Sequence, residues 1–157
     1  MKFSELEYRR PDVARIEEDY KALIERVKKA ETDEEILDIW AAHQRLSTEF
    51  NLSDRTVYIR NTMNTKDEFY LGEKAYFNSV SPSYYNTQNQ LYKALLEHPK
   101  LQVLADKFGS ILPKKMQVAL DAADESVIDL QREDNALVQE YDKLYASYMV
   151  DFQGKQV

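Results

Sequence analysis

Apolar residues recur at alternating intervals of three and four along most of this chain. The clearest stripe is Val13, Ile16, Tyr20, Leu23 and Val27. Because this spacing puts side chains on one face of a helix, it predicts an amphipathic α-helix over residues 12–30. Three glycines and four prolines in 157 residues leave few places where such helices would be interrupted. The sequence therefore predicts an all-α fold.

Capping and breaking signals divide the rest of the chain into further helices. Thr32 with Glu35 forms a capping box that begins a helix reaching Phe50, and residues 51–64 give a shorter one. A second capping box, Thr65 with Glu68, begins an aromatic segment. Ser81 as N-cap and Pro82 at the first helical position predict that a new helix starts there. A short helix over residues 101–108 ends at Gly109, and another follows Pro113.

The carboxyl end carries what the sequence predicts as its longest helix. Ser126 with Asp129 forms a third capping box. An apolar seam follows, made of Val127, Leu130, Leu137, Tyr141, Leu144 and Tyr148. After it, Val150 and Phe152 alternate with Asp151 before a turn at Gly154. We expect about seven antiparallel-packed helices in a domain of residues 1–148, with residues 149–157 starting a truncated β-hairpin.

Composition and charge exclude several classes of protein. The net charge of −7 disfavours binding to phosphate backbones, so nucleic acid is not an expected partner. Without cysteine there is no thiol nucleophile and no thiolate metal site. The three glycines lie too far apart for a dinucleotide-binding fingerprint or a phosphate-binding loop. No signal peptide or membrane-spanning stretch is apparent, and a cytoplasmic location is expected.

The two histidines offer little for metal chemistry. A helical zinc site of the His-Glu-x-x-His type needs two imidazoles one turn apart, whereas His43 and His98 are 55 residues apart. His43 falls on the apolar stripe of its helix and is predicted to be a buried core residue, and His98 to lie at a helix end. Most carboxylates belong to helix first turns and solvated faces. We therefore expect no catalytic residue, metal ligand or cofactor-binding residue in this chain.

One segment differs from the rest because it lacks charge. Residues 75–92 contain 18 consecutive uncharged residues that are rich in tyrosine, asparagine, glutamine and serine. Aromatic faces and amide groups can contact peptides without a charged partner. The predicted peptide- or domain-contact residues are Tyr76, Tyr84, Tyr85, Asn86 and Asn89, several of which should be exposed on one surface. The alternative is a helical hairpin buried by its neighbours.

Four stretches carry a family resemblance. They are FSELEYRRPDV at the start, IRNTMNTKDEFY (59–70), YKALLEHPKLQVLADKFG (92–109) and LQREDNALVQEYDKLYAS (130–147). In this order they resemble the amino-terminal region of oligoendopeptidase F-like zinc peptidases, relatives of the thimet oligopeptidases. The resemblance implies an all-helical clamshell whose carboxy-terminal half holds the zinc, so that zinc would belong to the parent enzyme. It also implies that the matching residues lie in the half that faces the catalytic domain across the cleft, namely Arg60, Thr62, Thr65, Asp67, Glu68, Phe69, Tyr70, Glu140, Tyr141 and Lys143. The sequence departs from the family at Asn61, where histidine is frequent.

Two functions remain open at this stage. The first is the non-catalytic helical domain of a cytoplasmic zinc oligoendopeptidase, which would form a wall of the substrate cleft and limit peptide size. The second is a stand-alone helical domain that binds peptides or proteins without catalysis, and a helical bundle with an undetected metal site is a weaker third. The expected partners are the catalytic remainder of the peptidase and oligopeptides. A homodimer through exposed apolar surface is also expected if that remainder is missing.

Overall fold

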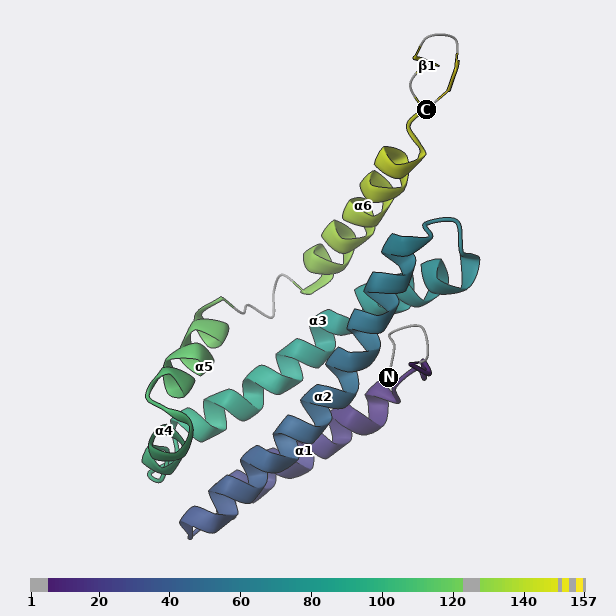
Figure 1. Ribbon diagram of the computed structural model, residues 1–157. Coiled ribbons are helices and arrows are strands. Elements are labelled where there is room, and N and C mark those ends of the chain that lie inside the picture. The colour runs from purple at the N-terminus through teal and green to yellow at the C-terminus, as the bar shows by residue number, and fades with distance from the viewer. Residues whose placement is uncertain (1–5, 123–127, 150, 153–154, 157) are drawn as a thin grey trace.

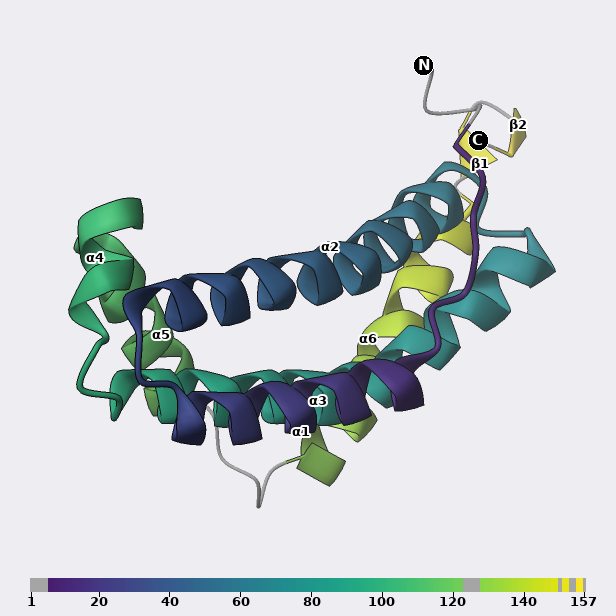
Figure 2. The same ribbon diagram turned by 90° about the horizontal axis from the view of Figure 1, so that it is seen from below.

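The computed structural model describes residues 6–122, 128–149, 151–152 and 155–156, and it is helical along most of that length. The helices are α1 (Val13–Lys29), α2 (Asp33–Met63), α3 (Glu68–Leu96), α4 (Gln102–Phe108), α5 (Ile111–Asp121) and α6 (Ile128–Ser147). Helices α1, α2 and α3 pack against one another. Helices α4 and α5 lie together near one end of α3, and α6 lies toward the other end (Figures 1 and 2). Within the described residues, no helix is both long and apolar enough to cross a bilayer.

The first helix confirms the prediction made from apolar spacing. The five residues of its predicted stripe are its buried residues, and they face α2 and α3. The side chain of Asp12 caps its amino end by accepting the N–H of Arg15. At the start of α2, Thr32 and Glu35 form the predicted reciprocal capping box. Local sequence therefore fixes both helix starts.

Helix α2 corrects the predicted division into two helices, because it runs unbroken through residues 51–63. No glycine or proline interrupts that stretch. Its polar residues are accommodated within the helix, since the hydroxyls of Ser53 and Thr56 donate to the backbone carbonyls of Glu49 and Leu52 one turn earlier. The mixed periodicity arises because Thr56, Val57 and Asn61 are buried here in place of a regular apolar stripe.

Helix α3 corrects the predicted restart at Ser81, because Pro82 lies inside a continuous helix of 29 residues. Proline lacks the N–H that would bond the carbonyl four residues earlier, which belongs to Asn78. In the structure this carbonyl accepts instead from the side-chain amide of Asn135 on α6, at 3.4 Å. The next carbonyl, of Ser79, accepts from Nε of Arg132 at 3.0 Å. Helix α6 thus replaces the hydrogen bond that the proline removes and adds a second contact beside it.

These two continuous helices reduce the count from about seven to six among the described residues. The amino end of α3 also differs from the prediction: Asp67 is the N-cap and accepts from the N–H groups of Phe69 and Tyr70, in place of a Thr65 capping box. Asp67 is preferred over Thr65 as the N-cap because its carboxylate can accept from two backbone N–H groups at once. The third predicted box contains Ser126, which lies outside the described residues.

The carboxyl end contains two strands of two residues each. Strand β1 (Asp151–Phe152) pairs antiparallel with β2 (Lys155–Gln156), with Asp151 opposite Gln156 and Phe152 opposite Lys155. Val150 and Gly154, used in the sequence prediction, lie outside the described residues. The division into residues 1–148 and 149–157 remains a prediction.

Candidate functional site

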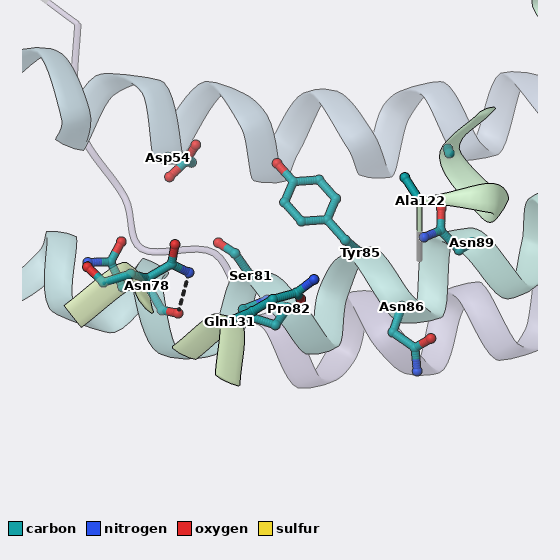
Figure 3. A pocket seen from close by; sticks show the side chains of 11 residues that line it. Asp54, Asn78, Ser81, Pro82, Tyr85, Asn86, Asn89, Ala122 and Gln131 are labelled. Atoms are coloured by element: carbon teal, nitrogen blue, oxygen red, sulfur yellow. Dashed lines mark hydrogen bonds between the residues drawn. The ribbon is translucent and has the colours of Figure 1, made fainter. Parts of the chain in front are cut away.

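One face of α3 lines a pocket of about 420 Å³ in the middle of the molecule (Figure 3). Asn78, Pro82, Tyr85 and Asn89 share this face because they are spaced by four, three and four residues. Helix α2 supplies Asp54 opposite them, and α5 and α6 supply small or amide side chains. Four separate helices therefore enclose a pocket whose polar groups are mostly neutral.

A second pocket of about 700 Å³ adjoins the first. The two share Tyr85, Asn89 and Ala119, so they form one depression along α3. The second pocket continues past the aromatic rings of Trp40 and Tyr92. We call the combined depression the α3 groove.

The structure divides the five predicted contact residues into three environments. Tyr85 is exposed and lines both pockets, Asn86 lines the first, and Asn89 lines both. Tyr84 is wholly buried, which corrects its assignment to an exposed surface. The half-buried Tyr76 lies outside both pockets, with the guanidinium of Arg10 over its ring at 4.4 Å. Residues 75–92 are neither wholly exposed nor wholly core, because a long helix in the middle of a domain has one face toward the core and another toward solvent.

Tyr84 is buried because it completes the core. Its ring stacks on that of Phe50 with centroids 3.6 Å apart, and its hydroxyl accepts from the amide of Gln88 at 3.3 Å. The hydroxyl of Tyr20 lies 3.4 Å from that of Tyr84 and 3.1 Å from Nδ1 of His43. These buried polar groups satisfy one another, as the interior requires. Tyr84 therefore has a structural role.

His43 is buried, as predicted, and it also contributes to the wall of the second pocket. The Tyr92 hydroxyl lies 3.4 Å from Nε2, and the Trp40 ring packs 4.5 Å from the imidazole. Burial lowers the pKa of His43 to about 4, so the imidazole is neutral at pH 7. Its two ring nitrogens face Tyr20 and Tyr92, so His43 is a neutral part of the pocket wall.

The carboxylate of Asp54 is the charged group of the first pocket. Its side chain is about a quarter exposed, and burial raises its pKa. Within the described part of the chain, the one cation within 4 Å of it is Arg55, whose Nε lies 3.8 Å from Oδ2. Sequence reasoning missed Asp54 because it lies on α2, outside the uncharged segment, and only packing brings it opposite Tyr85.

Helix α6 packs on α3 through its polar face. Four amide and charged side chains of α6 form hydrogen bonds with α3 at this contact: Arg132, Asn135, Gln139 and Asp142. The predicted apolar seam points away from this contact. Its described members are exposed, together with two neighbouring residues, and we call the set the α6 apolar stripe: Leu130, Leu137, Val138, Tyr141, Leu144, Tyr145 and Tyr148. Several are two-thirds exposed or more, so the stripe covers no core within the described residues.

A buried carboxylate that the sequence did not reveal holds the amino-terminal segment. Glu73 of α3 is 4% exposed, and it accepts from Nε of Arg10 at 3.0 Å and from the hydroxyl of Tyr8. These hydrogen bonds, with that from Arg10 the larger influence, lower the pKa of Glu73. The guanidinium of Arg60 acts similarly, because it donates to the carbonyl of Leu6 and the hydroxyl of Tyr70. Both clusters hold the segment to the bundle and need no ligand.

Asn61, where the resembled family often has histidine, is buried near the carboxyl end of α2. Its side-chain nitrogen has no hydrogen-bond partner among the described residues. Such an orphaned donor is uncommon in a folded interior.

The side chains that the structure describes do not gather around a place for a zinc ion. Among the described residues, no three His, Cys, Asp or Glu side chains gather into a possible metal site. Both imidazoles are engaged elsewhere: His43 lies between Tyr20 and Tyr92, and His98 bonds the carbonyl of Ala30 at 3.2 Å as well as the N–H of Lys100. No chemical step in this chain is therefore assigned to a metal.

Comparison with known proteins places this geometry in a family. Three solved chains superimpose with TM-scores of 0.93 to 0.94 over at least 99% of this chain. They are Pz peptidase A, solved with an inhibitor, at 29% identity, and two candidate oligoendopeptidases F at 27%, one of them from Bacillus anthracis. The chain spans 28 to 29% of the length of each.

The search of curated proteins found no match. The profile of the peptidase M3 N-terminal domain matches residues 3–123, which is most of the chain. The resemblance carried by the four sequence stretches is therefore confirmed, and the chain belongs to the peptidase M3 N-terminal domain family.

Proposed function

We propose that this chain is the non-catalytic helical domain of a cytoplasmic zinc oligoendopeptidase that hydrolyses short peptides. In this proposal it forms part of the wall of the substrate cleft and helps to limit peptide size, while zinc and the catalytic residues come from the rest of the peptidase. The observation that carries it is the α3 groove, where Tyr85, Asn86 and Asn89 lie among neutral hydrogen-bonding groups. Amide and tyrosine side chains suit a peptide backbone because they can both donate and accept hydrogen bonds.

Peptide binding to the 157-residue chain tests this proposal. Trp40 is the single tryptophan and lines the groove, so its fluorescence can report binding without a label. We expect short peptides to change its emission in a saturable manner. Tyr85→Ala should weaken binding about tenfold or more, as expected when a central aromatic contact is removed. Tyr58→Ala is the matched control because Tyr58 is exposed on α2 outside both pockets. Equal affinities for the two variants would reject the groove as the binding surface.

We further propose that the catalytic remainder of an M3 peptidase covers the α6 apolar stripe. Exposed apolar patches of this extent are uncommon on monomers and mark interaction surfaces. The solved relatives are more than three times as long as this chain, so their additional chain is available to cover an equivalent face. The stripe is also the face that α3 leaves uncovered, since α3 takes the polar side of α6.

Replacing two members of the stripe tests this partner. Leu137→Ser with Tyr141→Ser should abolish association with the remainder of the peptidase supplied as a separate chain. The doubly changed chain should keep its helical circular dichroism, because both side chains are about two-thirds exposed. The other outcome is a homodimer, which light scattering would detect. If the two substitutions make that dimer dissociate, the stripe is the interface between two copies of this chain.

The alternative function is a stand-alone helical interaction domain without catalysis. The exposed α6 apolar stripe is the observation that favours it, because the stripe could bind any partner with an apolar face. Activity separates the two functions. If the chain and the remainder together hydrolyse peptides and neither does so alone, the oligoendopeptidase function holds. If hydrolysis is unaffected by this chain, the interaction domain is favoured.

A further inference from the structure

The α3 groove carries one charge of each sign, one in each of its two pockets. Among the described lining residues, Asp54 is the charged group of the first pocket and Lys115 that of the second, since His43 is neutral at pH 7. The rest of the lining is uncharged and consists of amide, hydroxyl, aromatic and aliphatic side chains, including Tyr85, Asn89 and Met116. The groove is therefore dipolar.

The carboxylate of Asp54 is poorly compensated by the chain itself. It points into the space between α2 and α3, toward Ser81 and Asn78 (Figure 3). Its contact with Arg55, at 3.8 Å, is at the outer limit of an ion pair, and no hydrogen bond to it is formed within the described residues. Carboxylates this far buried usually accept hydrogen bonds. A bound cation with several N–H donors would supply them.

The length of the groove can be estimated from the helix that runs along it. Asp54 and His43 are eleven residues apart on α2, which corresponds to about 16 Å at the helical rise of 1.5 Å per residue. Lys115 borders the same pocket as His43. An extended peptide advances about 3.3 Å per residue, so about five or six residues would span this distance. A peptide of that length has an ammonium group at one end and a carboxylate at the other.

We propose that the α3 groove binds unmodified peptides of about five or six residues by their two ends, with the terminal ammonium at Asp54 and the terminal carboxylate at Lys115. The proposal rests on the proposed function, because it assumes that the groove contacts peptides. The neutral middle of the groove contacts backbone and makes no demand for a particular charged side chain. Recognition therefore depends on peptide length and on free ends more than on sequence.

Trp40 fluorescence with a set of alanine–glycine peptides tests the proposal. Peptides of three to ten residues with free ends should bind best at five or six. Acetylating the amino end should weaken binding about fivefold to tenfold, and amidating the carboxyl end about threefold. An acetylated peptide that begins with lysine distinguishes a terminal ammonium from a side-chain ammonium, and it should not recover the lost affinity.

Single substitutions assign each end to its residue. In Asp54→Asn, acetylation should no longer change the affinity, and in Lys115→Gln, amidation should no longer change it. The matched controls, Asp38→Asn and Lys114→Gln, remove the same charges outside the groove and should retain the wild-type effects.

The outcomes separate this inference from the proposed function. If peptides bind and Tyr85→Ala weakens them, but capping the ends has the same effect in Asp54→Asn as in wild type, end recognition is wrong and the groove still contacts peptides. Affinity that is independent of length would also overturn the inference. If no peptide binds at all, both the inference and the groove as a peptide site fail.

Discussion

Helices α1 and α6 both carry an apolar stripe, but only α1 turns that stripe toward the rest of the domain. The apolar stripe of α1 is buried against α2 and α3, with Ile16 and Tyr20 fully covered. The α6 apolar stripe is exposed, and the polar face of α6 makes the contact with α3. Apolar spacing thus predicts a helix and its two faces. It does not specify which face packs within the domain when the other face can be covered by another part of a larger protein.

Among the changes that test this comparison, shortening a core side chain should have the largest effect on stability. Phe50 stacks on Tyr84 and is fully buried. Phe50→Ala should lower the free energy of unfolding by about 3–5 kcal/mol, because it removes apolar contact and leaves a cavity. Urea denaturation measures the change. A loss below about 1 kcal/mol would show that this region is not the core.

Acid should also destabilise the α1–α3 region through His43. Its pKa falls from the ordinary value near 6.5 to about 4 in the folded chain. Between these values the unfolded chain binds the proton and the folded chain does not, so stability decreases as the pH falls from 6.5 to 4. The loss should reach about 3 kcal/mol by pH 4. His43→Gln should have a visibly smaller slope across this window, and identical slopes would contradict the assignment.

The attachment of α6 should depend on polar contacts. Asn135→Ala removes the donor to the Asn78 carbonyl left open by Pro82. We expect a loss of about 1 kcal/mol, confined to α6, because a hydrogen bond is lost and a carbonyl is left to water. Amide hydrogen exchange should accelerate in α6 while the amides of α1 keep their protection. Uniform acceleration in both helices would show that α6 belongs to the same cooperative unit as the core.

The smallest effect is expected on the exposed face of α6. Leu137→Ala should change the stability of the isolated chain by no more than about 0.5 kcal/mol, because its side chain is 64% exposed. Urea denaturation alongside Phe50→Ala makes the comparison direct. A loss of 2 kcal/mol or more would mean that the stripe is covered within this chain.

The sequence predicted those parts of the fold that depend on local interactions. The α1 stripe, the Thr32–Glu35 capping box and the burial of His43 are read from residues close in the chain, and all are confirmed. The family was also readable from four short stretches, and the M3 profile confirms it. Local periodicity and capping suffice here because helical hydrogen bonds and caps join residues within one turn.

Tertiary structure decided whatever depends on residues distant in sequence. Pro82 predicts a helix start, but Asn135 of α6, 53 residues later, donates to the Asn78 carbonyl that the proline leaves without a helical partner. Tyr84 and Tyr85 are neighbours in an uncharged segment, yet one stacks on Phe50 in the core and the other faces the groove. Asp54 enters that groove only because α2 lies opposite α3. Adjacent side chains on a helix point about 100° apart, so only the packing of whole helices determines which become core and which become site.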